Sequence, residues 1–184
     1  GCQLVQKEQP PAPVNNTPLV VDEAMQMRDW DRSTNYYANG ATVTVSNPAT
    51  GAKVGTAPVC RAGETRRAIE AADAAWPAWR AKTARERSAI LRRWYELMMA
   101  NVDDLALILT TEQGKPLAEA RGEVTIGAAY VEWFAEEARR IYGDVIPTIG
   151  NDRRLVVIKQ PIGVCAAITP WNFPCSMITR KVAP

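Results

Sequence analysis

The chain has 184 residues, of which 47% are hydrophobic and 23% are charged, as in ordinary globular proteins. Its net charge of +2 is too small to predict binding to nucleic acid, and no apolar run approaches the roughly 18 residues of a transmembrane segment. Histidine is absent, which excludes histidine-activated serine or cysteine nucleophiles and removes the usual nitrogen ligand of zinc. We therefore predict no metal site.

Residues 1–40 differ from the rest of the chain, and we predict a flexible or unrelated tail there. The proline-rich stretch from Gln9 to Pro18 predicts an extended, partly polyproline-like linker. Gly1-Cys2 resembles the junction at which bacterial lipoproteins are cleaved and lipidated, which leaves a lipid anchor on Cys2 as an alternative to an ordinary tail.

A β-hairpin and a series of helices are predicted from Val43 onward. Alternating side chains around the turn Pro48 to Gly51 predict two short paired strands. The 3–4 spacing of apolar residues predicts four helices: Glu64 to Trp79, the region from the capping box Thr83-x-x-Glu86 to Asn101, Asp103 to Thr111, and Pro116 to about Tyr142.

Three residues within these helices carry separate expectations. Pro77 should kink or end the first helix, because its ring removes one backbone hydrogen bond. Gly122 and Gly127 lie inside the last helix, where glycine is unfavourable by up to about 1 kcal/mol relative to alanine. They predict a close approach to a neighbouring helix.

Two strands and the start of a helix complete an order of elements that predicts an α/β fold. Arg153 to Gln160 and Val164 to Ile168 are the predicted strands, and the second has the continuous apolar sequence of a strand buried in a parallel sheet. Pro170 to Asn172 predicts a turn, and Pro174 predicts the first turn of a helix. In α/β proteins, cofactors and reacting groups lie at such strand-to-helix connections.

Trp171, Asn172 and Arg180 are the candidate site residues of this stretch. Trp171 can line a flat ligand or close the edge of the core, and the Asn172 amide can donate to a developing oxyanion or cap the helix. Arg180 can clamp a carboxylate substrate or lie solvated on the helix surface. Spacing alone favours the structural interpretation of each and leaves the functional one open.

The four cysteines, Cys2, Cys60, Cys165 and Cys175, include no C-x-x-C pair, and we predict free thiols. Cys175 lies near a predicted helix N-terminus, an environment that can activate a thiol. The alternative for Cys165 and Cys175 is that each is a small buried hydrophobic residue.

Five segments carry a family resemblance: SNPATG from Ser46, ETRRAIEAADAAWPAWR from Glu64, EQGKPLAEARGE from Glu112, EWFAEEARRIYGD from Glu132 and VIKQPIGVCAAITPWNFPCSMITRKVAP from Val157. From about Val43 to Pro184 the chain resembles the N-terminal part of an aldehyde dehydrogenase. The similarity is greatest to the succinate-semialdehyde dehydrogenase branch, and it does not extend to residues 1 to about 40.

The resemblance implies an incomplete, Rossmann-like cofactor domain over residues 41–184, with NAD or NADP as the cofactor. It implies that the Asn172 side chain helps to form the oxyanion hole and that Arg180 grips the distal carboxylate of the substrate. The residues that it implies for the cofactor site are Ile168, Thr169, Pro170, Trp171 and Asn172.

The family's nucleophilic cysteine and general-base glutamate lie beyond Pro184, so this truncated chain is predicted to be inactive alone. The implied activity of a full-length parent is NAD(P)-dependent oxidation of an aldehyde, succinate semialdehyde to succinate, by a cytoplasmic homo-oligomer. Cys165 and Cys175 stand where the family carries apolar residues, so neither inherits the nucleophile's role. The alternative is a non-catalytic envelope lipoprotein or scaffold that uses the helices as a packing module.

Overall fold

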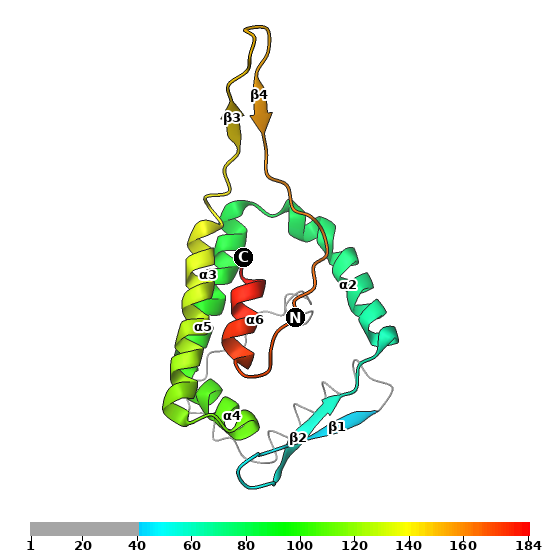
Figure 1. The fold of residues 1–184 in the computed structure, drawn as a ribbon, viewed down its shortest axis with the longest axis vertical. Coiled ribbons are helices and arrows are strands. Elements are labelled where there is room, and N and C mark those ends of the chain that lie inside the picture. The colour runs from blue at the N-terminus through cyan, green and yellow to red at the C-terminus, as the bar shows by residue number, and fades with distance from the viewer. Residues whose placement is uncertain (1–40) are drawn as a thin grey trace.

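The computed structural model describes residues 41–184 (Figure 1). The interpretations of residues 1–40, including the proline-rich linker and the lipid anchor on Cys2, lie outside the described residues and stay predictions. The described elements are, in chain order, a hairpin, four helices, a second hairpin and a final helix.

The first hairpin has the predicted antiparallel form. Strands β1 (Thr42–Ser46) and β2 (Lys53–Pro58) pair with Val43 opposite Ala57. The side-chain oxygen of Asn47 accepts hydrogen bonds from two backbone amides of the connecting turn, at 2.9 and 3.3 Å. Asparagine is favoured at this place because its side chain can satisfy turn amides in this way.

Helix α2 (Ala62–Ala81) stands apart from the other helices (Figure 1). Of the two outcomes predicted for Pro77, a kink or an end of the helix, the end is wrong, because α2 continues past this proline to Ala81. Its apolar stripe is formed as the spacing predicts, but Ile69 on that stripe is 53% exposed. The periodicity therefore gives the correct helix without indicating what its apolar side contacts.

Four helices form a bundle in which α5 contacts each of the others (Figure 1). They are α3 (Ala84–Ala100), α4 (Val102–Gln113), α5 (Leu117–Glu137) and α6 (Pro174–Val182). We refer to these four helices as the bundle. Because α5 is central, its side chains supply most of the core.

The core of the bundle consists largely of small side chains. Val124, Ala128 and Val131 of α5 have no exposed surface, and Met98 of α3 and Ala183 pack with them. A second cluster joins α4 to α5 and contains Ala106, Leu109 and Ala120. Small side chains allow the backbones of neighbouring helices to approach closely.

The ends of these helices follow from local chemistry. The capping box that begins α3 is confirmed: the Glu86 amide donates to Thr83 Oγ1 at 3.3 Å, and the Thr83 amide donates to Glu86 Oε2 at 2.7 Å. Helix α4 ends at Gly114, whose φ of 82° is a left-handed conformation that glycine adopts without a Cβ clash.

Helix α5 ends earlier than predicted, at Glu137 and not near Tyr142. The amides of Arg139 and Arg140 bond to carbonyls three residues back, which tightens the last turn and closes the helix. Strand β3 (Asp144–Ile146), which the sequence analysis did not predict, follows this turn.

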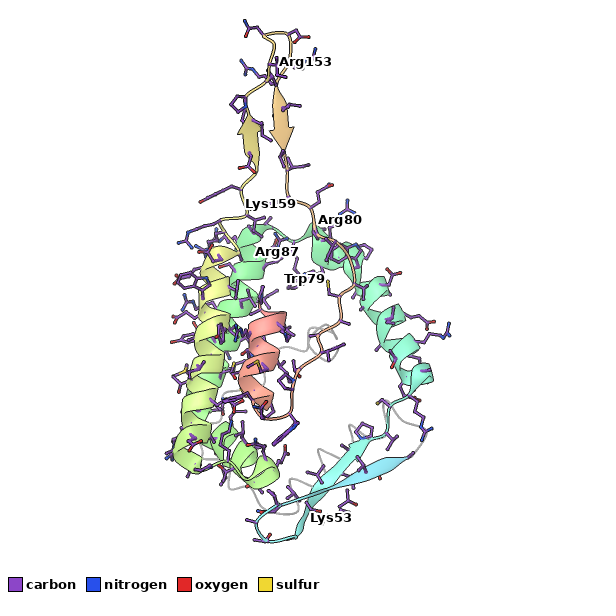
Figure 2. All side chains as sticks on the ribbon, in the orientation of Figure 1. Lys53, Trp79, Arg80, Arg87, Arg153 and Lys159 are labelled. Atoms are coloured by element: carbon purple, nitrogen blue, oxygen red, sulfur yellow. The ribbon has the colours of Figure 1, made fainter. Side chains whose placement is uncertain are left out.

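Strand β3 pairs in antiparallel orientation with β4 (Leu155–Val157), so the predicted strand Arg153 to Gln160 is confirmed only at its centre. The hairpin projects away from the bundle (Figure 1). Figure 2 shows Arg153 near the tip of this hairpin and Lys159 near its base.

The prediction of a buried parallel strand from Val164 to Ile168 is wrong. This segment is extended but forms no ladder, and Ile168 is 89% exposed. A parallel strand needs a neighbour reached through a crossover connection. Among residues 41–184 both sheets are two-stranded and antiparallel, so no such neighbour is present.

Candidate functional site

The loop before α6 carries the residues that the resemblance assigns to a cofactor. The segment from Ile168 to Trp171 is extended and mostly exposed, and the Trp171 side chain is 78% exposed. Pro174 then begins α6 as predicted, where its missing N–H leaves no intrahelical bond unmade. Trp171 therefore does not close the edge of the core that the described residues form.

Asn172 has a fixed backbone and an exposed side chain. Its carbonyl oxygen accepts hydrogen bonds from Lys115 Nζ at 2.9 Å and from Gln113 Nε2 at 3.3 Å. The side-chain amide does not cap α6, because that helix has no side-chain cap at its N-terminus. The structural interpretation of Asn172 as a helix cap is therefore wrong, and its amide is available as a hydrogen-bond donor.

A buried carboxylate lies beneath this loop. The Glu123 side chain on α5 is 1% exposed, and the Lys115 side chain that pairs with it is 9% exposed. One carboxylate oxygen accepts from Lys115 Nζ, and the other accepts from the amides of Cys175 and Ser176 at 2.9 and 3.2 Å. Glu123 thus satisfies two free amides in the first turn of α6.

Arg180 lies on α6 beside a groove of about 400 Å³ between α5 and α6. Its guanidinium carbon is 5.6 Å from the centre of the Tyr130 ring, and it forms no ion pair with another described residue. The groove is lined by Lys115, Glu119, Gly122, Glu123, Ile126, Tyr130, Phe173, Ser176, Met177 and Arg180. An arginine without a carboxylate partner, in a largely apolar groove, suits a ligand with a carboxylate end.

The structure brings some of the predicted site residues together and leaves others separate. Lys115 links them, because it lines the groove beside Arg180 and also bonds to the Asn172 carbonyl. Ile168, Pro170 and Trp171 do not line this groove and stay on the exposed segment. Among the described residues, the candidate site therefore has two parts: the largely apolar groove beside Arg180, and the exposed segment from Ile168 to Trp171.

Lys115 and Glu123 were not predicted as site residues. Both lie in the segment EQGKPLAEARGE, and Glu123 is on the same helix face as the fully buried Ala120 and Val124. A charged residue among buried apolar neighbours is the signal that could have identified it, since such a charge needs a partner.

Cys175 does not supply a reactive thiolate at this loop. Cys60, Cys165 and Cys175 are free, as predicted, while Cys2 lies outside the described residues. Burial, assisted by the negative charge of Glu123, raises the pKa of the Cys175 thiol to about 11. Cys175 is therefore protonated near neutral pH, and its position at a helix N-terminus does not activate it.

Residues 41–184 contain neither a cluster of metal ligands nor a helix that could span a membrane. No group of three or more cysteine, aspartate or glutamate side chains in this range could hold a metal ion. None of the helices in this range combines the length and the apolar sequence that crossing a membrane requires.

The sequence is similar to known proteins over most of its length. The model of the Aldehyde dehydrogenase family matches residues 36–184. The chain belongs to this family. It is 68% identical over 146 residues to a glutarate-semialdehyde dehydrogenase of Pseudomonas putida, and 56% identical over 171 residues to a succinate-semialdehyde dehydrogenase (NADP(+)) of Escherichia coli.

The chain spans about a third of the length of these aldehyde dehydrogenases. The two alignments cover 79% and 93% of the chain but 30% and 35% of the relatives. The family model begins at residue 36, whereas the Escherichia coli alignment includes part of segment 1–40. The comparisons give no support to the lipoprotein alternative.

A solved aldehyde dehydrogenase structure shares the fold. The crystal structure of succinate-semialdehyde dehydrogenase from Burkholderia pseudomallei superimposes with a TM-score of 0.76 at 64% identity, covering 78% of this chain and 30% of that one. The predicted resemblance to the semialdehyde branch is confirmed, as is an aldehyde-dehydrogenase-like fold that is incomplete over these residues. Because the chain covers only about 30% of the solved structure's length, its few short strands are consistent with that fold.

Proposed function

We propose that residues 41–184 supply one wall of the active site of a semialdehyde dehydrogenase, which oxidises an aldehyde that carries a carboxylate at its far end. The observation that supports this most is Arg180, which lies in an apolar groove without a carboxylate partner among the described residues. The relatives named for glutarate and succinate semialdehydes act on aldehydes of this class.

Two residues have direct roles in the proposed reaction. The Asn172 amide donates a hydrogen bond to the aldehyde oxygen as that oxygen takes up negative charge, and so it lowers the energy of the transition state. Arg180 binds the distal carboxylate through paired N–H donors, which orients the aldehyde end. These two contacts bind opposite ends of the substrate.

Ile168, Thr169, Pro170, Trp171 and Asn172 would line the nicotinamide cofactor, NAD or NADP. All but the half-buried Thr169 are exposed, and the apolar surface of Ile168, Pro170 and Trp171 fits a planar ring. When bound, the cofactor accepts a hydride from the aldehyde carbon. The resemblance assigns the nucleophile and the general base to regions beyond Pro184, so the 184-residue chain is proposed to be inactive by itself.

The remaining assignments are also part of the proposal. Residues 41–184 would form the N-terminal part of the cofactor domain, with residues 1–40 as a tail. The full-length protein would be a cytoplasmic homo-oligomer, and the exposed apolar side chains of the second hairpin, such as Val145 and Ile149, support self-association. Mass spectrometry of Cys2 tests the lipid-anchor alternative, and light scattering tests the oligomer.

The activity is tested in a protein of the relatives' full length that contains this chain. We expect NADH or NADPH to form with succinate or glutarate semialdehyde, and Asn172→Ala should lower kcat by about 100- to 1,000-fold. Asn151→Ala, at the tip of the second hairpin, is the matched control and should leave kcat unchanged. The absence of turnover with either semialdehyde, or full activity of Asn172→Ala, would contradict the proposal.

A further inference from the structure

The ion pair between Lys115 and Glu123 is the most buried pair of charges among the described residues. The other described pairs are at least partly exposed, and such pairs contribute little to stability. Even a buried pair is often no more stabilising than apolar side chains of the same shape. The Lys115–Glu123 pair therefore matters less for its contribution to stability than for the groups that the two side chains hold in place.

Glu123 fixes the start of α6 against α5. Its Oε1 atom accepts from the amides of Cys175 and Ser176, at 2.9 and 3.2 Å. These amides have no intrahelical acceptor, and the positive end of the helix dipole attracts the carboxylate. The first turn of α6 therefore has a defined position along α5.

Lys115 extends the same connection to the preceding loop. Its ammonium group bonds to Glu123 Oε2 and donates to the Asn172 carbonyl at 2.9 Å. It also lies 3.9 Å from the centre of the Phe173 ring, within the range of a cation–π interaction. One ion pair thus contacts four of the five residues from Asn172 to Ser176, and the fifth, Pro174, has no N–H to bond.

We propose that Lys115 and Glu123 are positioning residues for Asn172: they hold its backbone so that its side-chain amide is aimed at the substrate oxygen. This inference rests on the proposed function, because it assumes the oxyanion role of Asn172. It goes beyond that function because it assigns the orientation of the Asn172 amide to Lys115 and Glu123, which do not contact the reacting atoms.

Lys115 is the stronger of two hydrogen-bond donors to the Asn172 carbonyl oxygen, so its loss should lower kcat measurably. Gln113 Nε2 also donates to Asn172, but at 3.3 Å and without a charge, so it is the weaker anchor. Loss of Lys115 would leave Asn172 present but less well oriented. We expect Lys115→Met to lower kcat by about 10-fold, less than removal of the amide itself, since small misplacements of a reacting group are costly.

A double-mutant cycle in the full-length protein separates positioning from a general loss of stability. It measures kcat for the unaltered protein, Lys115→Met, Asn172→Ala and the double variant. If Lys115 acts through Asn172, Lys115→Met lowers kcat about 10-fold when Asn172 is present and has almost no effect when Asn172 is alanine. An equal decrease in both backgrounds would overturn the inference.

Two further variants serve as controls for the double-mutant cycle. Lys53→Met removes a lysine from the first hairpin, where Figure 2 shows it away from α6, and should leave kcat unchanged. Lys115→Met with Glu123→Gln leaves no unpaired buried charge, so it should fold even if the single variant does not. This double replacement should show the same dependence on Asn172, and a full kcat would overturn the inference.

Hydrogen exchange gives a readout that does not depend on turnover. The Cys175 and Ser176 amides should exchange at least about 10-fold faster in Glu123→Ala than in the unaltered protein, while those of α3 do not change. Unchanged exchange at both amides would overturn the role of Glu123. If Asn172→Ala alone leaves kcat unaltered, the proposed function fails at the oxyanion, and this pattern of exchange would show that the ion pair is structural only.

Discussion

The bundle and the outer elements, by which we mean the two hairpins and α2, differ in where their apolar side chains lie. In the bundle, Val124 and Val131 have no exposed surface, whereas in the second hairpin Val145 is 74% exposed. Both regions have regular secondary structure, so the difference is one of packing and not of local conformation. Because only the bundle buries its apolar side chains, the bundle is the part that mainly determines the position of the candidate site.

The candidate site lies across the boundary between these regions. Arg180 and the Asn172 backbone are held by the bundle, through α6 and Lys115. Ile168 to Trp171 belong to the exposed segment that returns from the second hairpin to α6 (Figure 1). The residues proposed to bind the substrate are therefore the ones that this chain positions by its own contacts.

The same substitution in the two regions should give the largest contrast. Val124→Asp places a carboxylate among fully buried side chains, and we expect it to lower the free energy of unfolding by more than about 4 kcal/mol. Val156→Asp in β4, where the valine is 67% exposed, should change it by no more than about 1 kcal/mol. Urea unfolding followed by helical circular dichroism measures both, and equal losses would show that the bundle is not the stable unit.

Replacing each of the two glycines of α5 by alanine should change the free energy of unfolding in opposite directions. A Cβ at Gly127 would lie 3.2 Å from Thr179 Oγ1 and 3.3 Å from Cys175 Sγ, so the predicted close helix approach is confirmed there. At Gly122 nothing lies within 4 Å, and that prediction is wrong. We expect Gly127→Ala to destabilise by about 1–2 kcal/mol and Gly122→Ala to stabilise by up to about 1 kcal/mol.

Thermal unfolding of the two alanine variants checks this contrast. Gly122→Ala is the control for the helix propensity of alanine, because the two substitutions are on the same helix. A stabilising Gly127→Ala would mean that α6 does not pack as closely on α5 as the contacts indicate.

The smallest expected effect concerns Cys175: its rate of alkylation and its contribution to the pH dependence of stability. Since burial raises the pKa of Cys175 to about 11 from an ordinary value of 9.0, its thiol should resist iodoacetamide near neutral pH, whereas the exposed Cys60 and Cys165 react. The folded state holds this proton more tightly than the unfolded state. Its contribution to stability is therefore complete below about pH 9 and is lost as the pH rises toward 11.

Peptide mapping of the alkylated protein measures the first expectation, and unfolding between these pH values measures the second. Labelling of Cys175 at the rate of Cys60 would show that α6 leaves α5 readily. Stability that rises over this pH interval would contradict the assigned direction of the pKa change.

The helices of the bundle could be predicted because their signals are local. The capping box at Thr83 and the proline at Pro174 specify where α3 and α6 begin, and the 3–4 spacing specifies which side is apolar. The end of α5 was misplaced because a tightened last turn leaves no strong mark in the sequence.

Two other errors concern contacts between distant parts of the chain. Val164 to Ile168 has the sequence of a buried strand, yet a strand exists only with a neighbour, which residues 41–184 do not provide. Glu123 was missed for the same reason, since the Cys175 amide that it accepts from lies 52 residues later. The roles proposed for Asn172 and Arg180 came from the family resemblance, because their spacing alone favoured structural roles.

The most direct test of the central claim is the effect of substrate charge on Arg180→Ala in the full-length protein. We expect the KM for succinate or glutarate semialdehyde to rise by at least about 10-fold, because the carboxylate loses its charged partner, while the KM for an uncharged aldehyde of similar length changes less than about 2-fold. Lys181→Ala, the adjacent exposed cation on α6, is the matched control. Equal increases in KM for charged and uncharged aldehydes would contradict the assignment of Arg180 to the substrate carboxylate.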